Sequence, residues 1–249
     1  MKAFKTIFKT ELKLSLRGMD MLIFAICMPV VVFVILGIIY GSKPASEGAG
    51  YTFLEQSFGA VTAIAICAGG VMGLPLVVSD YRNRKILKRF KVTPVSPTLI
   101  LLAQVAVCAV YSFASLVLIY LASVLFFGCS FNGSWPVFLG FYLLVMLSMF
   151  SIGMLVGGVS KDMKTASVLC CVLYFPMLIF SGTTLPYEVM PKALQKVADF
   201  MPLTQGIKLL KASSLGLPTQ SVLLPIVVMV VLAVICIGIS IRFFKWESK

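Results

Sequence analysis

The chain has 249 residues, of which 60% are hydrophobic and 12% are charged, whereas soluble domains carry about 25% charged residues. This composition excludes a soluble domain, a disordered chain and a disulfide scaffold, and it indicates a helical membrane protein. The sequence contains no histidine, so His-dependent nucleophiles, His zinc sites and haem ligation are excluded. The net charge of +12 fits either nucleic acid binding or membrane topology, and its distribution along the chain decides between them.

A basic, amphipathic segment, residues 2–17, precedes the first apolar stretch. Its apolar residues recur at helical spacing and its lysines occupy much of the remaining surface; they are Phe4, Ile7, Phe8, Leu12 and Leu16, and Lys2, Lys5, Lys9 and Lys13. This pattern favours a helix in the cytoplasmic interface over a short basic tail that only fixes topology. The following apolar stretch has 20 residues, longer than the roughly 7–15 of a signal peptide, so we expect a retained membrane span.

Uncharged stretches mark six predicted membrane spans. They cover residues 21–40, 56–79, 99–127, 137–159, 165–181 and 221–241. The uncharged run 99–159 has 61 residues and is divided by the turn-forming segment 128–136. We therefore expect an all-α membrane protein with a single transmembrane domain over residues 1–249. No charged residue lies inside a predicted span, which argues against a proton-coupled carrier.

The placement of Lys and Arg predicts the orientation of the chain. Segments 1–20, 80–98, 160–164 and 242–249 carry 16 of the 21 basic residues, so both termini and the 80–98 link are expected to be cytoplasmic. Topology accounts for the charge, and nucleic acid binding is not expected. The seven cysteines form no C-x-x-C pair and lie in or beside apolar stretches, so we expect small buried side chains rather than a metal or redox site.

Glycine pairs in the spans permit close contact between helices. The pairs are Gly69-x-x-x-Gly73 and Gly153-x-x-x-Gly157. Such contact can form within one chain or between two copies. Because the bundle is rich in glycine, we expect packing within the chain.

The cytoplasmic link 80–98 is basic, amphipathic and bounded by proline. A helix is favoured over residues 82–91. Its apolar positions and terminating prolines are Ile86, Leu87, Phe90, Pro94 and Pro97. A loop that only fixes topology needs charge alone, whereas this pattern is typical of a docking element for acidic residues of a partner or for anionic lipid.

The outer segment 182–220 has helical patterning of its own. Two short amphipathic helices are predicted, one with Pro191 in its first turn and one beginning at Pro202. The preceding span has only 17 residues. Two interpretations stay open: the segment dips into the outer leaflet and closes the outer end of a pathway, or it is an interfacial loop that covers the bundle.

The two segments together resemble the permeases of type 2 ATP-binding-cassette (ABC) exporters. The family motif Arg-Glu-x-x-x-Leu-Lys-Arg-Leu-x-x-Thr-Pro-x-Ser corresponds to residues 82–96, with Asn83 where an acid is usual. That departure puts any ion pair of the acid in doubt. The family stretch Ser-Gly-x-x-x-Pro…Pro…Leu-Gln…Pro-Leu-Thr corresponds to residues 181–204. With six spans and a similar length, the resemblance covers essentially the whole chain.

The resemblance implies a permease subunit in the bacterial cell membrane that exports a drug, peptide antibiotic or lipid. It implies a dimer with a second copy or a paralogue, and a separate ATPase that binds ATP and Mg. This sequence agrees, because it has no G-x-x-x-x-G-K-[ST] loop. No cofactor or metal is expected in this chain itself. The implied ATPase-coupling residues are Arg82, Lys85, Leu87, Lys88, Arg89, Phe90, Lys91, Thr93 and Pro94. The implied outer gate comprises Ser181, Gly182, Pro186, Pro191, Pro202, Leu203 and Thr204.

Three other functions stay open from the sequence. An ATP-independent channel or secondary carrier would transport without a partner. A membrane enzyme would need an unusual Ser–Lys or Cys arrangement, and no Lys lies in a predicted span. A scaffold or immunity protein would bind an antibiotic without moving it.

Overall fold

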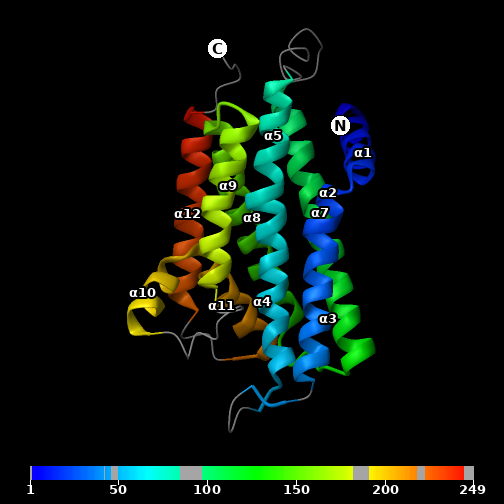
Figure 1. Cartoon of the computed structure of the whole chain (residues 1–249), viewed down its shortest axis with the longest axis vertical. Helices are drawn as coiled ribbons and strands as arrows, with labels where there is room; N and C mark the ends of the chain where they lie inside the picture. The colour runs from blue at the N-terminus through cyan, green and yellow to red at the C-terminus, as the bar shows by residue number, and fades with distance from the viewer. Residues whose placement is uncertain are drawn as a thin grey trace.

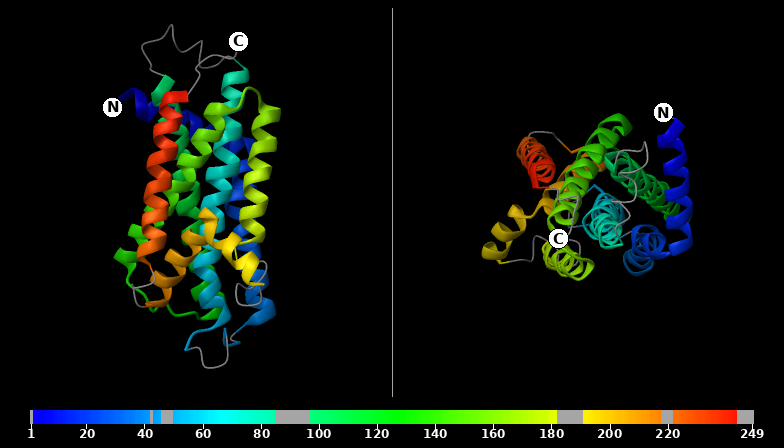
Figure 2. Two further views of the ribbon diagram at one scale, coloured as in Figure 1. Left: turned by 90° about the vertical axis from the view of Figure 1, so that its left-hand side faces the viewer. Right: turned by 90° about the horizontal axis from the view of Figure 1, so that it is seen from above.

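A computed structural model describes residues 2–41, 43–45, 50–84, 97–181, 191–217 and 222–243. Within these ranges the chain is a bundle of long helices that run roughly along one axis (Figures 1 and 2), and the single β feature is an isolated bridge between Pro44 and Thr52. The all-α prediction is therefore confirmed for the described residues. Helix α1 (Lys2–Gly18) and the C-terminal end of α12 (Leu223–Phe243) lie at the same end of the bundle, which we call the inner end.

Five helices in the described ranges are long and apolar enough to cross a membrane. They are Ile23–Tyr40, Phe53–Asn83, Thr98–Phe127, Trp135–Val159 and Leu223–Ser240. They correspond to five of the six predicted spans. The remaining predicted span, 165–181, coincides with α9 (Met163–Ile179), which is apolar but has 17 residues, shorter than the roughly 20 that a crossing needs.

Two of these long helices contain a π-helical segment. The first span consists of α2 (Asp20–Leu22), η1 (Ile23–Cys27) and α3 (Met28–Tyr40). The second consists of α4 (Phe53–Cys67), η2 (Ala68–Gly73) and α5 (Leu74–Asn83), and together they form a continuous helix of 31 residues. The third and fourth are α7 (Pro97–Phe127) and α8 (Trp135–Val159).

The helix 53–83 is the most buried of the five, and glycine allows its neighbours to approach closely. Gly153 of α8 lies directly against the carbonyl oxygen of Gly70, where any Cβ would collide with it. A Cβ on Gly157 would lie 3.1 Å from the Cβ of Val78. The Gly153–Gly157 pair therefore packs within the chain, as the sequence predicted, and sets the distance between α8 and the central helix.

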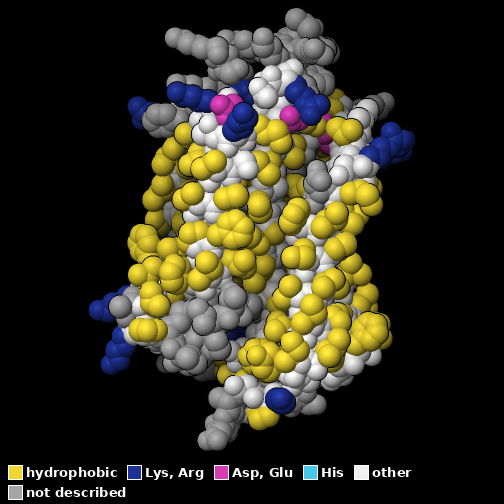
Figure 3. All heavy atoms as spheres, in the orientation of Figure 1, with side chains coloured by type: hydrophobic (Ala, Val, Ile, Leu, Met, Phe, Trp, Pro, Cys, Tyr) yellow, Lys and Arg dark blue, Asp and Glu magenta, His cyan; other side chains and the backbone are white. Residues whose placement is uncertain are grey.

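The sides of the bundle are covered by apolar side chains. Figure 3 shows this belt on one face, with the visible acidic and most of the visible basic side chains at the inner end and a few basic ones near the other end. Helices α3 and α12 contribute many exposed Val, Ile and Leu side chains to this belt. Such a large apolar surface suits contact with lipid and does not suit contact with water.

Helix α1 lies beside α7 at the inner end (Figure 2), and it corresponds to the segment predicted to be amphipathic, residues 2–17. Phe8 and Leu12 pack against the core, as expected. Leu16 was expected on the same face but is exposed, because the contacts of α1 with the core come from its middle turns. The helix ends at Gly18, and Met19 follows with a left-handed φ of 57°.

Candidate functional site

The inner end of α5 carries two adjacent polar residues just before the predicted coupling segment. Tyr81 and Arg82 are only 8% and 4% exposed. The Tyr81 hydroxyl donates to the Glu11 carboxylate on α1. Gln104 Nε2 of α7 donates to the same carboxylate oxygen at 2.6 Å and to the Tyr81 hydroxyl oxygen at 3.2 Å. This inner polar cluster (Glu11, Tyr81, Gln104) joins α1 to the helices on both sides of the predicted coupling segment.

Arg82 binds the opposite neighbour, α8. Its guanidinium donates to the carbonyl oxygen of Ser160, and Nη2 donates to the carbonyl oxygens of Gly157 at 2.6 Å and Gly158 at 2.9 Å. The last carbonyls of a helix lack partners in their own helix and carry its negative dipole end, so a cation is stabilised there. The inner end of α5 is thus tied to α1 and α7 through Tyr81 and to α8 through Arg82.

The position of Arg82 differs from the sequence expectation. The sequence placed it among residues that face an ATPase, whereas its side chain lies inside the chain against α8. The predicted span ended at residue 79, before the first charge, but the helix continues to Asn83. It can continue because the guanidinium charge is satisfied by the α8 carbonyls instead of water. Arg84 then forms an exposed pair with Asp80 at 2.9 Å.

Most of the predicted coupling segment lies outside the described residues. This holds for Lys85, Leu87, Lys88, Arg89, Phe90, Lys91, Thr93 and Pro94. Gly182 and Pro186 of the predicted outer gate lie outside them too. The roles assigned to these residues stay predictions.

The described residues of the predicted outer gate lie around the start of α11 (Pro202–Leu215). Thr204 Oγ1 donates to the Phe180 carbonyl at 3.3 Å, which brings α11 beside the end of α9, where Ser181 is buried. Leu203 is fully buried. Pro191 is the N-cap of α10 (Lys192–Phe200), one residue before the first turn where it was predicted, and Pro202 begins α11 as predicted.

Helices α10 and α11 differ in their surroundings. Helix α10 projects from the side of the bundle (Figure 1), and Phe200 at its end is 84% exposed. Helix α11 is buried on most sides and packs against α4, α8 and α12. Its backbone is very close to α4, since a Cβ on Gly59 would lie 2.7 Å from the Lys211 nitrogen. Helix α11 therefore fills the interior of the bundle near its outer end.

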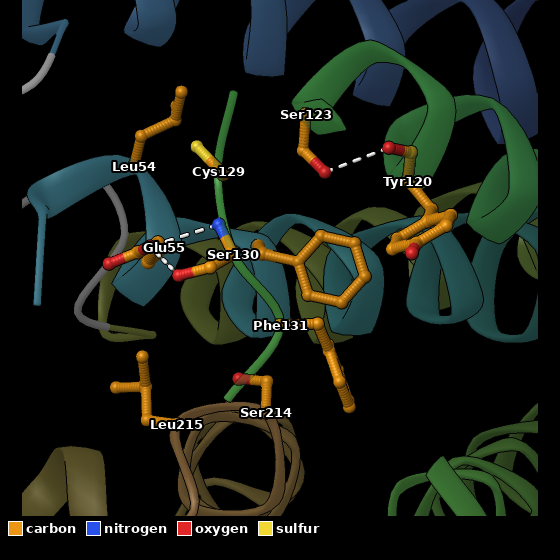
Figure 4. Close-up of a pocket in the computed structure, with 10 residues that line it drawn as sticks. Leu54, Glu55, Tyr120, Ser123, Cys129, Ser130, Phe131, Ser214 and Leu215 are labelled. Carbon is orange, nitrogen blue, oxygen red and sulfur yellow. Dashed lines mark hydrogen bonds between the residues drawn. The ribbon is translucent and has the colours of Figure 1, made fainter. Parts of the chain in front are cut away.

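A short connection between α7 and α8, residues 128–134, lies across the outer end, and we call it the outer strap. Glu55, in the first turn of α4, accepts through Oε1 from Ser130 N at 3.1 Å and from Ser130 Oγ at 2.9 Å (Figure 4). Its Oε2 accepts from Thr52 N at 2.9 Å, while Thr52 Oγ1 accepts from Glu55 N at 3.2 Å. One carboxylate thus completes the capping box of α4 and binds the strap.

A small hollow lies beneath the strap, beside Glu55 (Figure 4). Its volume is ≈ 20 Å³, enough for about one water molecule. Aromatic rings close one side: Phe131 stacks on Trp135 with centroids 4.2 Å apart and meets Phe58 edge-on at 6.2 Å. Cys129 also lines the hollow, and burial together with the nearby Glu55 charge raises the pKa of its thiol.

The residues that connect neighbouring helices at the two ends of the bundle were not identified from the sequence. Glu11 had a usable signal, since it is the single acid among residues 1–19 and lies three residues after Phe8, beside the apolar face. Thr52 and Glu55 match the spacing of a capping box. No local pattern indicates that Glu55 meets Ser130, 75 positions away. Among the described residues, no group of three or more Cys, Asp or Glu side chains is placed to hold a metal ion.

Comparison with known proteins identifies the family. Residues 2–215 match the family model of the ABC-2 type transporter. The chain is 32% identical over 97 residues to nodulation protein J of Rhizobium leguminosarum bv. viciae, which is 39% of this chain and 35% of that protein. It is 30% identical over 135 residues to the inner membrane transport permease YhhJ of Escherichia coli K12, which is 53% of this chain and 35% of that protein. The chain thus matches about a third of the length of these curated relatives. The helical bundle with its apolar belt and the match over most of its length place the chain in the ABC-2 type transporter family.

Proposed function

We propose that this chain is the permease subunit of an ATP-driven ABC exporter and that a separate ATPase docks on the segment that follows Arg82, residues 83–94. The observation that carries the proposal is the paired anchoring of Tyr81 and Arg82. These two residues stand directly before the docking segment and connect it to α1, α7 and α8. A displacement of the docking segment would therefore reach three neighbouring helices at once. A loop that only fixed topology would have no need of such connections.

The same proposal assigns the orientation and the number of spans. In this proposal the inner end, with α1 and the C-terminal end of α12, lies on the cytoplasmic side, as the excess of Lys and Arg in segments 1–20, 80–98, 160–164 and 242–249 predicts. Helix α9 serves as the sixth span despite its length. It runs beside α8 and α5 (Figure 1), and α11 fills the outer depth that α9 does not reach. Helix α1 then lies in the inner membrane interface, with its lysines toward the headgroups.

The cargo in this proposal is a lipophilic or amphiphilic compound, such as a drug, peptide antibiotic or lipid. Residues 56–79 of the central helix carry no charge, and neither do the other predicted spans. A path between such helices offers apolar side chains and a few hydroxyls, and a free ionic cargo would lose its hydration there. A second permease, either another copy or a paralogue, would complete the path, as the family resemblance implies.

Co-purification and one pair of variants test the proposal. The chain is tagged in its native host, extracted in mild detergent, and its partners are identified; a P-loop ATPase at equal stoichiometry is expected. Phe90→Ala should then uncouple ATP hydrolysis from transport, because a buried anchor contributes about 2 kcal/mol or more. Lys91→Ala is the matched control, since an exposed charge contributes roughly 0–1 kcal/mol. Transport without any ATPase, or equal effects of the two substitutions, would contradict the docking model.

A further inference from the structure

We propose that the outer strap (residues 128–134) is a latch that keeps α11 seated in the outer end of the bundle, and that Glu55 is the positioning residue that fastens it. The role of this latch in cargo release rests on the proposed function. The fastening itself does not, because it is a property of the chain alone.

The exposure of the strap residues alternates regularly along the segment. Cys129, Phe131 and Gly133 face inward while the residues between them face outward. Alternation with a period of two is the pattern of an extended segment with one face packed. The strap is therefore laid flat over the outer end, and it does not loop away from it.

The strap reaches α4 on one side and α11 on the other. At α4 it is held by the two hydrogen bonds from Ser130 to Glu55 Oε1. At α11, Gly133 lies so close to the carbonyl oxygen of Ser213 that any Cβ would collide, and a Cβ on Gly216 would lie 3.1 Å from the Asn132 carbonyl oxygen. The end of α11 therefore cannot move toward the strap unless the strap moves too.

The fastening is suited to release. Ser130 is exposed, and the carboxylate of Glu55 borders the hollow that has room for water. Water that enters can replace the Ser130 donors at Oε1, whereas Oε2 stays bound in the cap of α4. The strap can thus detach without unwinding the helix to which it is fastened.

Three substitutions separate a latch from a structural role. Glu55→Gln leaves one acceptor oxygen, which suffices for the capping box but not for the cap and the strap together. Thr52→Ala is the matched control, because it weakens the same cap and leaves the Glu55–Ser130 contact in place. Ser130→Ala removes the hydroxyl donor and keeps the charge at position 55, which excludes a change in thiol pKa as the cause of faster labelling.

The readout is the native thiol of Cys129, a strap residue whose side chain faces inward and lines the hollow. Its rate of reaction with a membrane-impermeant maleimide is measured in intact cells, with Cys129→Ala as the background. In the resting state Glu55→Gln should react at least tenfold faster than the unmodified protein, because both hydrogen bonds that Ser130 donates lose their charged acceptor. Ser130→Ala should react faster by a smaller factor, and Thr52→Ala should leave the rate unchanged. Equal rates for Glu55→Gln and Thr52→Ala would overturn the fastening.

The link to transport has its own measurement. During ATP turnover by the complex with its co-purified ATPase, the labelling rate of the unmodified protein should rise toward that of resting Glu55→Gln. A rate that does not change during turnover, while ATP is hydrolysed and cargo is moved, would overturn the role in release. If no ATPase is found but the resting rates follow the prediction, the fastening is supported and the proposed exporter function fails.

Discussion

Replacement of Arg82 by Met should severely destabilise the bundle. Arg82 is 4% exposed, and its guanidinium donates to three carbonyl oxygens at the end of α8. Each hydrogen bond to a charged group contributes about 1.5–3 kcal/mol, and the contributions are less than additive, so we expect a loss of about 3–5 kcal/mol. For a chain of this size that corresponds to a fall of roughly 6–20 °C in the thermal unfolding midpoint of the detergent-solubilised protein.

Arg84→Met provides the control, two residues along the chain with the same change of charge. The Arg84 side chain is 70% exposed and pairs with Asp80 one helical turn away. Such a pair contributes about 0.3–0.5 kcal/mol, so its midpoint should fall by at most about 2 °C. If the two substitutions lower the midpoint equally, Arg82 does not hold α8, and the reasoning from buried carbonyl contacts is wrong.

Two further matched pairs can be measured by the same thermal unfolding assay. Tyr81→Phe should lower the free energy of unfolding by about 1.5–3 kcal/mol, because it removes a donor to a carboxylate. Tyr111→Phe should leave this free energy unchanged or raise it, since the buried Tyr111 hydroxyl has no partner among the described residues. Similar losses of stability in the two variants would refute this. Gly153→Ala should cost about 1–3 kcal/mol because its Cβ meets the Gly70 carbonyl, whereas Gly140→Ala, with open space around it, should stabilise α8 by roughly 0.5–1 kcal/mol. A stabilising Gly153→Ala would contradict the close approach of the two helices.

The sequence predicted the helices well and the contacts between their ends poorly. Apolar length alone located five spans and the shorter α9, because each depends on residues adjacent in the chain. The helix of the second span continues four residues beyond the predicted end of the span, and Arg82 on this extension finds carbonyl acceptors on α8. Partners supplied by a distant helix cannot be read from a local pattern.

In the candidate site too, features that depend on neighbouring residues were predicted and contacts between distant residues were not. The turn residues 128–136 and the start of α11 at Pro202 followed from proline, glycine and asparagine, which act locally. The inner polar cluster and the Glu55–Ser130 contact join residues 70 or more positions apart, except where Gln104 meets Tyr81 across the coupling link. Only the tertiary fold decides such pairs, so the sequence identified single members and not their partners.

The continuous helix 53–83 has a mechanical consequence. At 1.5 Å per residue its 31 residues extend about 46 Å, so Glu55 near one end and Arg82 near the other belong to one continuous helical body. Rotation of this body by its inner contacts would turn Glu55 relative to Ser130. By thermodynamic reciprocity, any free energy that a partner at the inner end contributes to loosening the strap must equal the free energy that a loosened strap returns to partner binding. Partner binding at the inner end and loosening of the strap at the outer end would then be coupled through a single helix, without a contribution from the cargo.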